Sequence, residues 1–220
     1  MLKIISCALA LSVAVLAQAL VSYTPPRLVR GGLPALPGPT VIAGGEVMIE
    51  ATIDQSGALT HPIMLRSTTP FANMVLDAVS GWSFTPARAT TDGKEEVVDG
   101  SVLIAAVYRP PTSTNGSTIG EPPRNLATAS PNAPYAVSMK MPFYPLLARG
   151  GLVLLYEVSL DEAGQMIGIR GVGPDSGFDA AAKDALTQWQ FRGASVQGRP
   201  VPSTAYVIFG FVEPVVSSKP

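Results

Sequence analysis

The sequence predicts an α+β protein of two tandem small modules, each strand-strand-helix-strand with one helix packed on a small antiparallel sheet. Three observations lead to this prediction. The chain of 220 residues repeats itself at a fixed offset, and in each copy a stretch of alternating apolar residues precedes one with helical spacing. Only 14% of the residues are charged, whereas glycine and proline number 21 each, a composition that favours strands and turns over long surface helices.

The repeat consists of residues that recur 107 positions apart. Asp54 and Asp161 set this offset, and Gly57 then corresponds to Gly164. The same offset, without a gap, relates Phe71 to Phe178, Asp77 to Asp184, Ala78 to Ala185, Trp82 to Trp189, Phe84 to Phe191 and Ala87 to Ala194. Because both tryptophans of the chain are paired in this way, we expect two copies of one module.

The first copy, residues 40–110, shows the pattern of a half-buried strand and an amphipathic helix. Its expected elements are a strand over residues 47–53, a turn over 54–57, a strand over 58–66, a helix to about Ser80 and a strand over 97–108. Thr69 and Pro70 are typical of a helix N-cap and first helical residue. The helix stripe ends at Trp82, which we expect in the core rather than on a stacking surface.

The second copy, residues 139–215, repeats this order. Its expected elements are a strand over residues 152–160, a turn over 161–164, a strand over 165–172, a helix over 177–188 and a strand over 205–211. Ser176, followed three residues later by Asp179, resembles a capping box. Trp189 ends the apolar stripe of this helix and is also expected in the core.

Two extended stretches flank the first copy. Residues 20–39 form a leader, and residues 111–138 form a Pro/Ser-rich linker with few apolar side chains to bury. Since such a linker offers little surface to couple the copies, we expect each copy to fold independently.

The N-terminus predicts export. Lys3 precedes an apolar run over residues 4–16, and Ala17-Gln18-Ala19 follows, so residues 1–19 have the order of a signal peptide cleaved after Ala19. The apolar stretch continues to Val21, which makes it just long enough for a membrane anchor, and this stays open as the alternative. We expect the protein in the periplasm or cell envelope, with membrane contact only through this segment if it is uncleaved. The single cysteine, Cys7, lies within it.

Composition disfavours several other functions. A net charge of −1 gives no excess of cations for nucleic acid. His61 is the only histidine and no G-x-S-x-G elbow accompanies it, so we expect a surface residue and no enzyme, with no catalytic residue, cofactor or metal. The glycines of residues 171–177 lack the spacing of a phosphate-binding loop, and a turn before a helix explains them.

The second copy resembles the TonB C-terminal domain family. The resemblance begins at Tyr144-Pro145-Leu146-Leu147-Ala148 and covers about 75 residues, with Trp189-Gln190-Phe191 as its most specific element. The first copy is similar through its Trp82-Ser83-Phe84 but has no Tyr-Pro opening. The resemblance implies a periplasmic module that takes up an extended segment of an outer-membrane protein as an added strand beside its last strand.

We therefore expect an envelope module that recognises an extended peptide or receptor segment by strand addition, with a possible link to TonB-type transport. The expected binding residues are Tyr144, Pro145, Arg149, Val207, Ile208, Phe209 and Phe211. The alternative is a structural envelope protein whose modules self-associate or oligomerise through open sheet edges.

Overall fold

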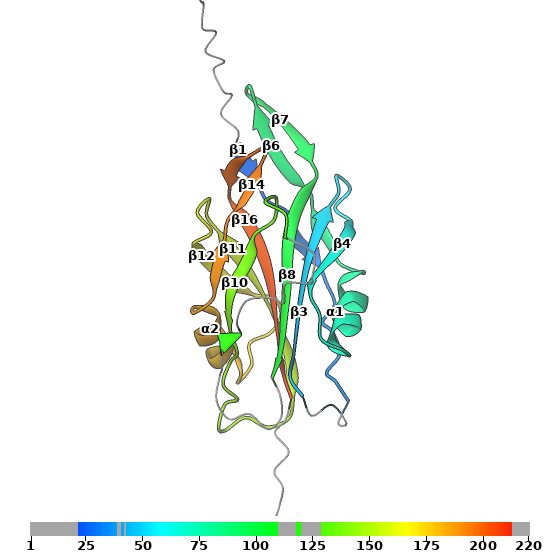
Figure 1. Ribbon diagram of the computed structural model, residues 1–220, viewed down its shortest axis with the longest axis vertical. Coiled ribbons are helices and arrows are strands. Elements are labelled where there is room, and N and C mark those ends of the chain that lie inside the picture. The colour runs from blue at the N-terminus through cyan, green and yellow to red at the C-terminus, as the bar shows by residue number, and fades with distance from the viewer. Residues whose placement is uncertain (1–21, 39–40, 42, 110–117, 120–128, 213–220) are drawn as a thin grey trace, which may run out of the picture.

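The computed structural model describes residues 22–38, 41, 43–109, 118–119 and 129–212. Within these residues the chain forms a mixed α+β, strand-rich fold with two helices, α1 (Phe71–Val79) and α2 (Asp179–Leu186). A long six-stranded sheet runs through the molecule, and smaller sheets lie around it (Figure 1). The predicted α+β class is confirmed, whereas the predicted signal peptide and most of the predicted linker lie outside the described residues.

The six-stranded sheet consists of two antiparallel trios joined in the middle. Its strands lie in the order β12 (Met166–Gly171), β11 (Leu152–Leu160), β16 (Ser203–Phe211), β8 (Gly100–Arg109), β3 (Gly45–Ile53) and β4 (Leu59–Arg66). We call β4, β3 and β8 the first trio, and β12, β11 and β16 the second trio. The trios meet where β16 pairs with β8 in parallel, with Ala205 opposite Leu103 and Phe211 opposite Arg109.

This parallel pairing corrects the expectation of two separate antiparallel sheets. Strands β8 and β16 are almost continuous apolar runs, and nearly every residue in them is buried. A strand of this composition is stable only where both faces and both edges are covered, as is usual for strands inside a larger sheet. Each trio therefore covers the last strand of the other.

The two helices lie on opposite faces of the sheet (Figure 1). Because successive strand residues point to opposite faces, Tyr206 and Ile208 pack in the core beneath α1, whereas Val207 and Phe209 pack in the core beneath α2. Each core thus contains side chains of both trios. Both faces of β3 are buried as well, so the predicted half-buried strand is wrong: Met48 lies in the α2 core and Ile49 in the α1 core.

The smaller strands belong to the predicted leader, the linker and the segments that follow the helices. The pairs are β1 (Ser22–Thr24) with β6 (Ala87–Thr91), β6 with β7 (Lys94–Val98), β2 (Arg27–Arg30) with β5 (Ser83–Thr85), β10 (Tyr135–Lys140) with β13 (Gln190–Arg192) and with β9 (Thr118–Ile119), and β14 (Ala194–Val196) with β15 (Arg199–Val201). The leader and the end of the linker are therefore strands of the folded structure and not merely extended connections.

The aspartates that revealed the repeat each close a turn. Asp54 accepts hydrogen bonds at Oδ1 from the backbone N–H groups of Ser56 (2.9 Å) and Ala58 (3.0 Å). Asp161 likewise accepts from Ala163 (2.9 Å) and Gln165 (2.7 Å). The glycine three residues after each aspartate has a positive φ, 83° and 80°, which explains why glycine stands there.

The helix starts agree with the predictions only in part. In α2 one half of the predicted capping box is present, because the Ser176 N–H donates to Asp179 Oδ2 at 2.6 Å, but the helix begins at Asp179 and no side chain caps it. In α1 the predicted N-cap Thr69 is wrong: the helix begins at Phe71 after Pro70, and no side chain caps it. Across the described residues, neither helix has the length and apolar character needed to cross a membrane.

Both tryptophans are buried, as predicted, and each donates a hydrogen bond to a segment that precedes the first predicted strand of its copy. Trp82 is 3% exposed and donates its indole N–H to the Gly32 carbonyl at 2.8 Å. Trp189 is 5% exposed and donates to the Lys140 carbonyl at 2.9 Å. Each tryptophan thus ties a helix end to the segment just after β2 or to the end of β10.

Candidate functional site

The predicted binding strand is not an open edge. β16 pairs with β11 on one side and with β8 on the other, and Val207, Ile208, Phe209 and Phe211 are all 0% exposed. A peptide cannot add beside a strand whose backbone groups are already paired on both sides. The assignment of these four residues to partner binding is therefore wrong for this fold.

Tyr144, Pro145 and Arg149 lie in the loop between β10 and β11. Tyr144 donates its hydroxyl to the Gly150 carbonyl at 2.6 Å, and its ring lies 5.4 Å from that of Phe178. Phe178 in turn lies 4.8 Å from Phe211, so Tyr144 lies near the end of β16 and reaches it through the Phe178 ring. The loop contacts this end through buried aromatic rings and not through a free strand edge.

The six-stranded sheet has two outer strands, and β4 is a poor acceptor for an added strand. Its partner among the described residues is β3, and the pairing shifts register on both sides of Glu50. His61 has a φ of 47°, and the next residue, Pro62, carries no N–H group. Proline and irregular backbone are common protections of an exposed sheet edge. His61 is exposed there, as predicted.

The other outer strand, β12, has an open edge whose pairing with β11 is regular over residues 168–171, and its one register shift lies at Ile167. Among the described residues it pairs only with β11, and the Val172 N–H donates to the Leu155 carbonyl at 2.8 Å. Because backbone groups alternate in an antiparallel ladder, Arg170 and Gly168 then face β11, whereas Ile169 and Gly171 direct their N–H and C=O groups outward. We call this outward side of residues 169–171 the β12 edge.

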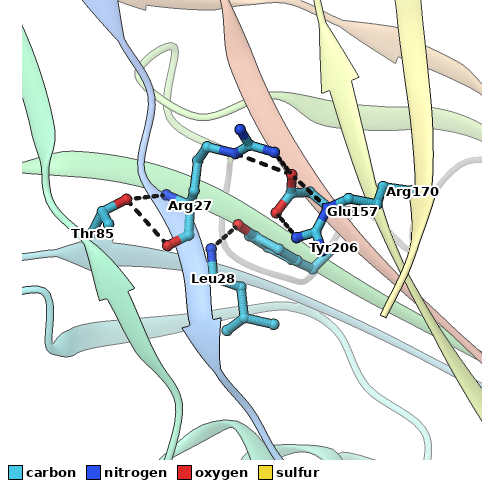
Figure 2. Close-up of polar contacts among 6 residues, drawn as sticks. All are labelled: Arg27, Leu28, Thr85, Glu157, Arg170 and Tyr206. Carbon is cyan, nitrogen blue, oxygen red and sulfur yellow. Dashed lines mark hydrogen bonds and ion pairs between the residues drawn. The ribbon is translucent and has the colours of Figure 1, made fainter. Parts of the chain in front are cut away.

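A buried carboxylate holds β12 and the leader strand together. Glu157 on β11 is 2% exposed, and it accepts hydrogen bonds from Arg27 on β2 (2.7 Å) and from Arg170 on β12 (2.8 Å). Figure 2 shows the two guanidinium groups converging on this carboxylate, with Tyr206 beside them. The Tyr206 hydroxyl accepts a hydrogen bond from the Leu28 N–H at 2.8 Å. The network fixes Arg170 on the α1 face and leaves the β12 edge open.

The ion pairs keep Glu157 charged. Burial is the largest single influence and would raise the pKa of its carboxyl, but the hydrogen bonds from Arg170 and Arg27 and their positive charges together outweigh it. The pKa of Glu157 therefore lies below its ordinary value of 4.5. Since the folded pKa is lowered, this group stabilises the fold above the unfolded pKa and ceases to do so as the pH falls through the folded pKa.

We predict that Glu157→Gln lowers the free energy of unfolding at neutral pH by about 1–3 kcal/mol, because it weakens a buried ion pair whose arginines are half exposed and can regain water. The variant should also lose part of the dependence of its melting temperature on pH below about pH 4.5. Thermal unfolding across this range measures both effects. Glu95→Gln, which affects an exposed pair with Arg88, is the control. Equal acid sensitivity of the Glu157→Gln variant and the wild type would contradict the assignment.

Sequence reasoning missed this network because Arg27 and Glu157 are 130 positions apart. One signal was present. Glu157 is the single charge inside the apolar strand of residues 152–160, and Glu50 occupies the position 107 residues earlier in the strand of the first copy. A charge at the same place in two apolar strands indicates a buried ion pair or hydrogen bond.

Clusters of side chains that could bind a metal ion are not found in the part of the chain that the structure describes. Those residues include no group of three or more His, Cys, Asp or Glu side chains placed to hold a metal ion. Comparisons of the chain with protein-family models, with curated proteins and with solved structures gave no match.

Proposed function

We propose that this chain is an exported envelope protein with two tandem copies of a module similar to the TonB C-terminal domain, and that it binds an extended segment of an envelope or outer-membrane protein by strand addition. The order of charge, apolar run and Ala17-Gln18-Ala19 supports export to the periplasm. The sequence resemblance in residues 144–201 supports the family. Binding, and not catalysis, is the proposed role.

The correspondence of the two trios supports the tandem copies. In the first copy β2 pairs with β5 through Leu28 and Phe84, and in the second β10 pairs with β13 through Ala136 and Phe191, each with one register shift. Glu50 accepts a hydrogen bond from the Ser130 N–H at 2.8 Å, as Glu157 accepts one from Arg27. In each copy, the segment that precedes the sheet thus donates a hydrogen bond to a buried glutamate of the other copy.

The observation that carries the proposal is the β12 edge. Its outward backbone groups at Ile169 and Gly171 are where a further antiparallel or parallel strand would pair. No proline interrupts β12, whereas Pro62 interrupts β4. Ile167, two residues before the β12 edge, is 67% exposed and offers apolar contact to an added segment. We therefore place the proposed site on β12, the second strand of the second copy, and not on β16, its last strand.

Gly171→Pro tests this edge. Proline removes an outward N–H and places its ring where the added strand would lie, so we predict at least tenfold weaker binding of an extended peptide. Gly171→Ala is the matched control, because it keeps the N–H and its Cβ would lie 3.8 Å from the Tyr156 ring, an ordinary contact. Titrations followed by NMR would use extended peptides from outer-membrane receptors.

Two results would contradict the proposed edge. One is equal peptide binding by the Gly171→Pro and Gly171→Ala variants when both keep the wild-type circular dichroism. The other is a set of peptide-induced shifts centred on β16 or on the helices, with none at Ile169 and Gly171. The wild-type chain with no peptide bound provides the reference spectrum.

The structural alternative has one observation in its favour. The parallel pairing of β8 with β16 is itself an association of two modules through their edge strands, here within one chain. If the β12 edge served to join copies of the chain, the wild type would form dimers in analytical ultracentrifugation and Gly171→Pro would be a monomer. A wild-type monomer that binds peptide would favour the binding role.

A further inference from the structure

The loop between β10 and β11 exposes large apolar side chains to an unusual degree. Leu146 is 94% exposed and Leu147 is 95% exposed, and Phe143 beside them is 47% exposed. Among the large hydrophobic side chains of the described residues, these two leucines are the most exposed. Contiguous exposed apolar side chains on an otherwise packed protein commonly mark a site of interaction.

The apolar side chains project from a firmly held base. Tyr144 anchors the loop through its hydrogen bond to the Gly150 carbonyl and its ring contact with Phe178. The Ala148 N–H donates to the Pro145 carbonyl at 3.1 Å, which closes a turn around the two leucines. The leucines are therefore presented by a turn of defined shape.

The chain segment that contains the loop carries positive side chains and no negative ones. No Asp or Glu occurs in the sequence between Glu121 and Glu157, whereas Lys140 and Arg149 lie on either side of the leucines. The net charge of the whole chain is −1, so this is a local excess of positive charge on a nearly neutral protein. Arg149 is exposed, and the hydrogen bond that it donates goes to the neutral Ala148 carbonyl.

A buried cation lies beneath the same loop. Arg109 is 1% exposed, and its guanidinium lies 5.7 Å from the centre of the Tyr144 ring. Within the described residues, its Nε and Nη1 atoms have no hydrogen-bond partner. Burial lowers the pKa of Arg109, yet a guanidinium stays protonated at neutral pH. The Arg109 guanidinium places a positive charge beneath the loop.

We infer that residues 143–149 form a membrane-docking loop that inserts Leu146 and Leu147 into the interface of a bilayer containing anionic lipids. Apolar side chains that enter the acyl boundary lose contact with water, and flanking Lys and Arg side chains attract anionic headgroups. This combination fits a lipid surface better than a peptide, because the leucines stand on a convex turn and not in a groove. The loop lies at the opposite end of the molecule from β1, β6 and β7 (Figure 1).

Membrane docking by residues 143–149 is separate from peptide binding at the β12 edge. It adds a second membrane contact to the one expected for the N-terminal segment. The first described residue, Ser22, lies in β1, at the end remote from the loop (Figure 1). Docking through the loop would therefore place the first described residues of the chain away from the bilayer that the loop contacts.

Vesicle co-sedimentation of the chain that starts at Leu20, the expected mature form, tests this inference. We expect binding to vesicles of phosphatidylglycerol and phosphatidylcholine, and much weaker binding to phosphatidylcholine alone. The double variant Leu146→Ser with Leu147→Ser should bind about tenfold more weakly, because two apolar side chains no longer enter the interface. Arg149→Gln should weaken binding about fivefold, and only where anionic lipid is present.

The control variant is Val29→Ser, which removes an apolar side chain that is 67% exposed in β2, outside the loop. It should bind vesicles as the wild type does. Since all the substituted side chains are exposed, the melting temperatures should be unchanged and loss of folding would not explain a loss of binding. Excess inorganic phosphate at constant ionic strength should not release the protein, because the bilayer and not a free anion is the partner.

The inference is overturned if the double leucine variant binds anionic vesicles as tightly as the wild type, or if the wild type does not bind them at all. Release by inorganic phosphate would instead indicate an anion site. Loss of peptide binding in the double leucine variant, with no vesicle binding by the wild type, would assign the loop to a protein partner. Gly171→Pro should bind vesicles normally, so failure at the β12 edge and failure at the loop are distinguishable.

Discussion

Replacing Trp82 or Trp189 with alanine is expected to lower the free energy of unfolding by about 3–5 kcal/mol. Each indole is buried and contacts an aromatic ring of β16 on its own face of the sheet, Trp82 with Tyr206 at 5.8 Å and Trp189 with Phe209 at 5.7 Å. Each substitution also removes the hydrogen bond to the carbonyl of Gly32 or Lys140, which is then left without its indole donor.

Urea unfolding followed by circular dichroism measures this loss. Phe143→Ala is the control, because that aromatic side chain is 47% exposed and its removal should change stability little. Trp82→Ala should affect the second trio as well, since Tyr206 belongs to β16. An unchanged unfolding midpoint in either tryptophan variant would contradict the core assignment.

Gly210→Leu is the second substitution with a large expected effect. Gly210 lies on β16 opposite Tyr108 of β8, and a Cβ atom at Gly210 would overlap the buried Tyr108 ring. Tyr108 also packs against Phe71 of α1 at 4.5 Å, so the clash would reach the core of the first trio. We expect a destabilisation of at least about 3 kcal/mol, because a packed core has no space for a side chain at this position.

The two tryptophans allow each trio to be followed separately. Trp82→Phe leaves Trp189 as the reporter near the second trio, and Trp189→Phe leaves Trp82 near the first. In the Gly210→Leu background both reporters should show the same lowered midpoint, since β8 and β16 share one sheet. Gly168→Ala is the control, because its Cβ would make an ordinary contact with Ser159 at 3.8 Å. A midpoint lowered for Trp189 alone would mean that the trios unfold separately.

Local sequence patterns predicted the elements that depend on local physics. The turns at Asp54 and Asp161 were predicted because a short acidic side chain and a glycine three residues later form a compact hydrogen-bonded unit. The strand over residues 152–160 was predicted with the observed bounds. Burial of Trp82 and Trp189 followed from the helical spacing that ends at each tryptophan.

The join between the trios could not be predicted in the same way. Parallel pairing of β8 with β16 brings together residues about a hundred positions apart, such as Leu103 and Ala205, and no turn connects them. The apolar character of both strands was visible, yet β16 was predicted to be an open edge that binds a partner. A strand with Val207, Ile208 and Phe209 in succession has no polar face, which favours an interior position in a sheet.

The leader and the linker were predicted to be extended from their composition alone. Composition did not reveal the strands that they contain. Prolines mark these segments as extended, but an extended segment also has the conformation of a strand. Leu28 and Ala136 pair with Phe84 and Phe191 because those strands, which follow the helices, would otherwise present unpaired backbone. Recognition of the partners required the long-range arrangement of the sheet.

The β12 edge, and not β16, is the proposed site of strand addition, and amide hydrogen exchange with and without peptide tests this claim most directly. In the free chain the amides of Val207, Ile208 and Phe209 should exchange slowly, because β16 is paired on both sides. The outward amides of Ile169 and Gly171 should exchange quickly and become protected when an extended peptide is bound. Rapid exchange along β16 in the free chain, with protection there and not at Ile169 and Gly171 on addition of peptide, would contradict the account.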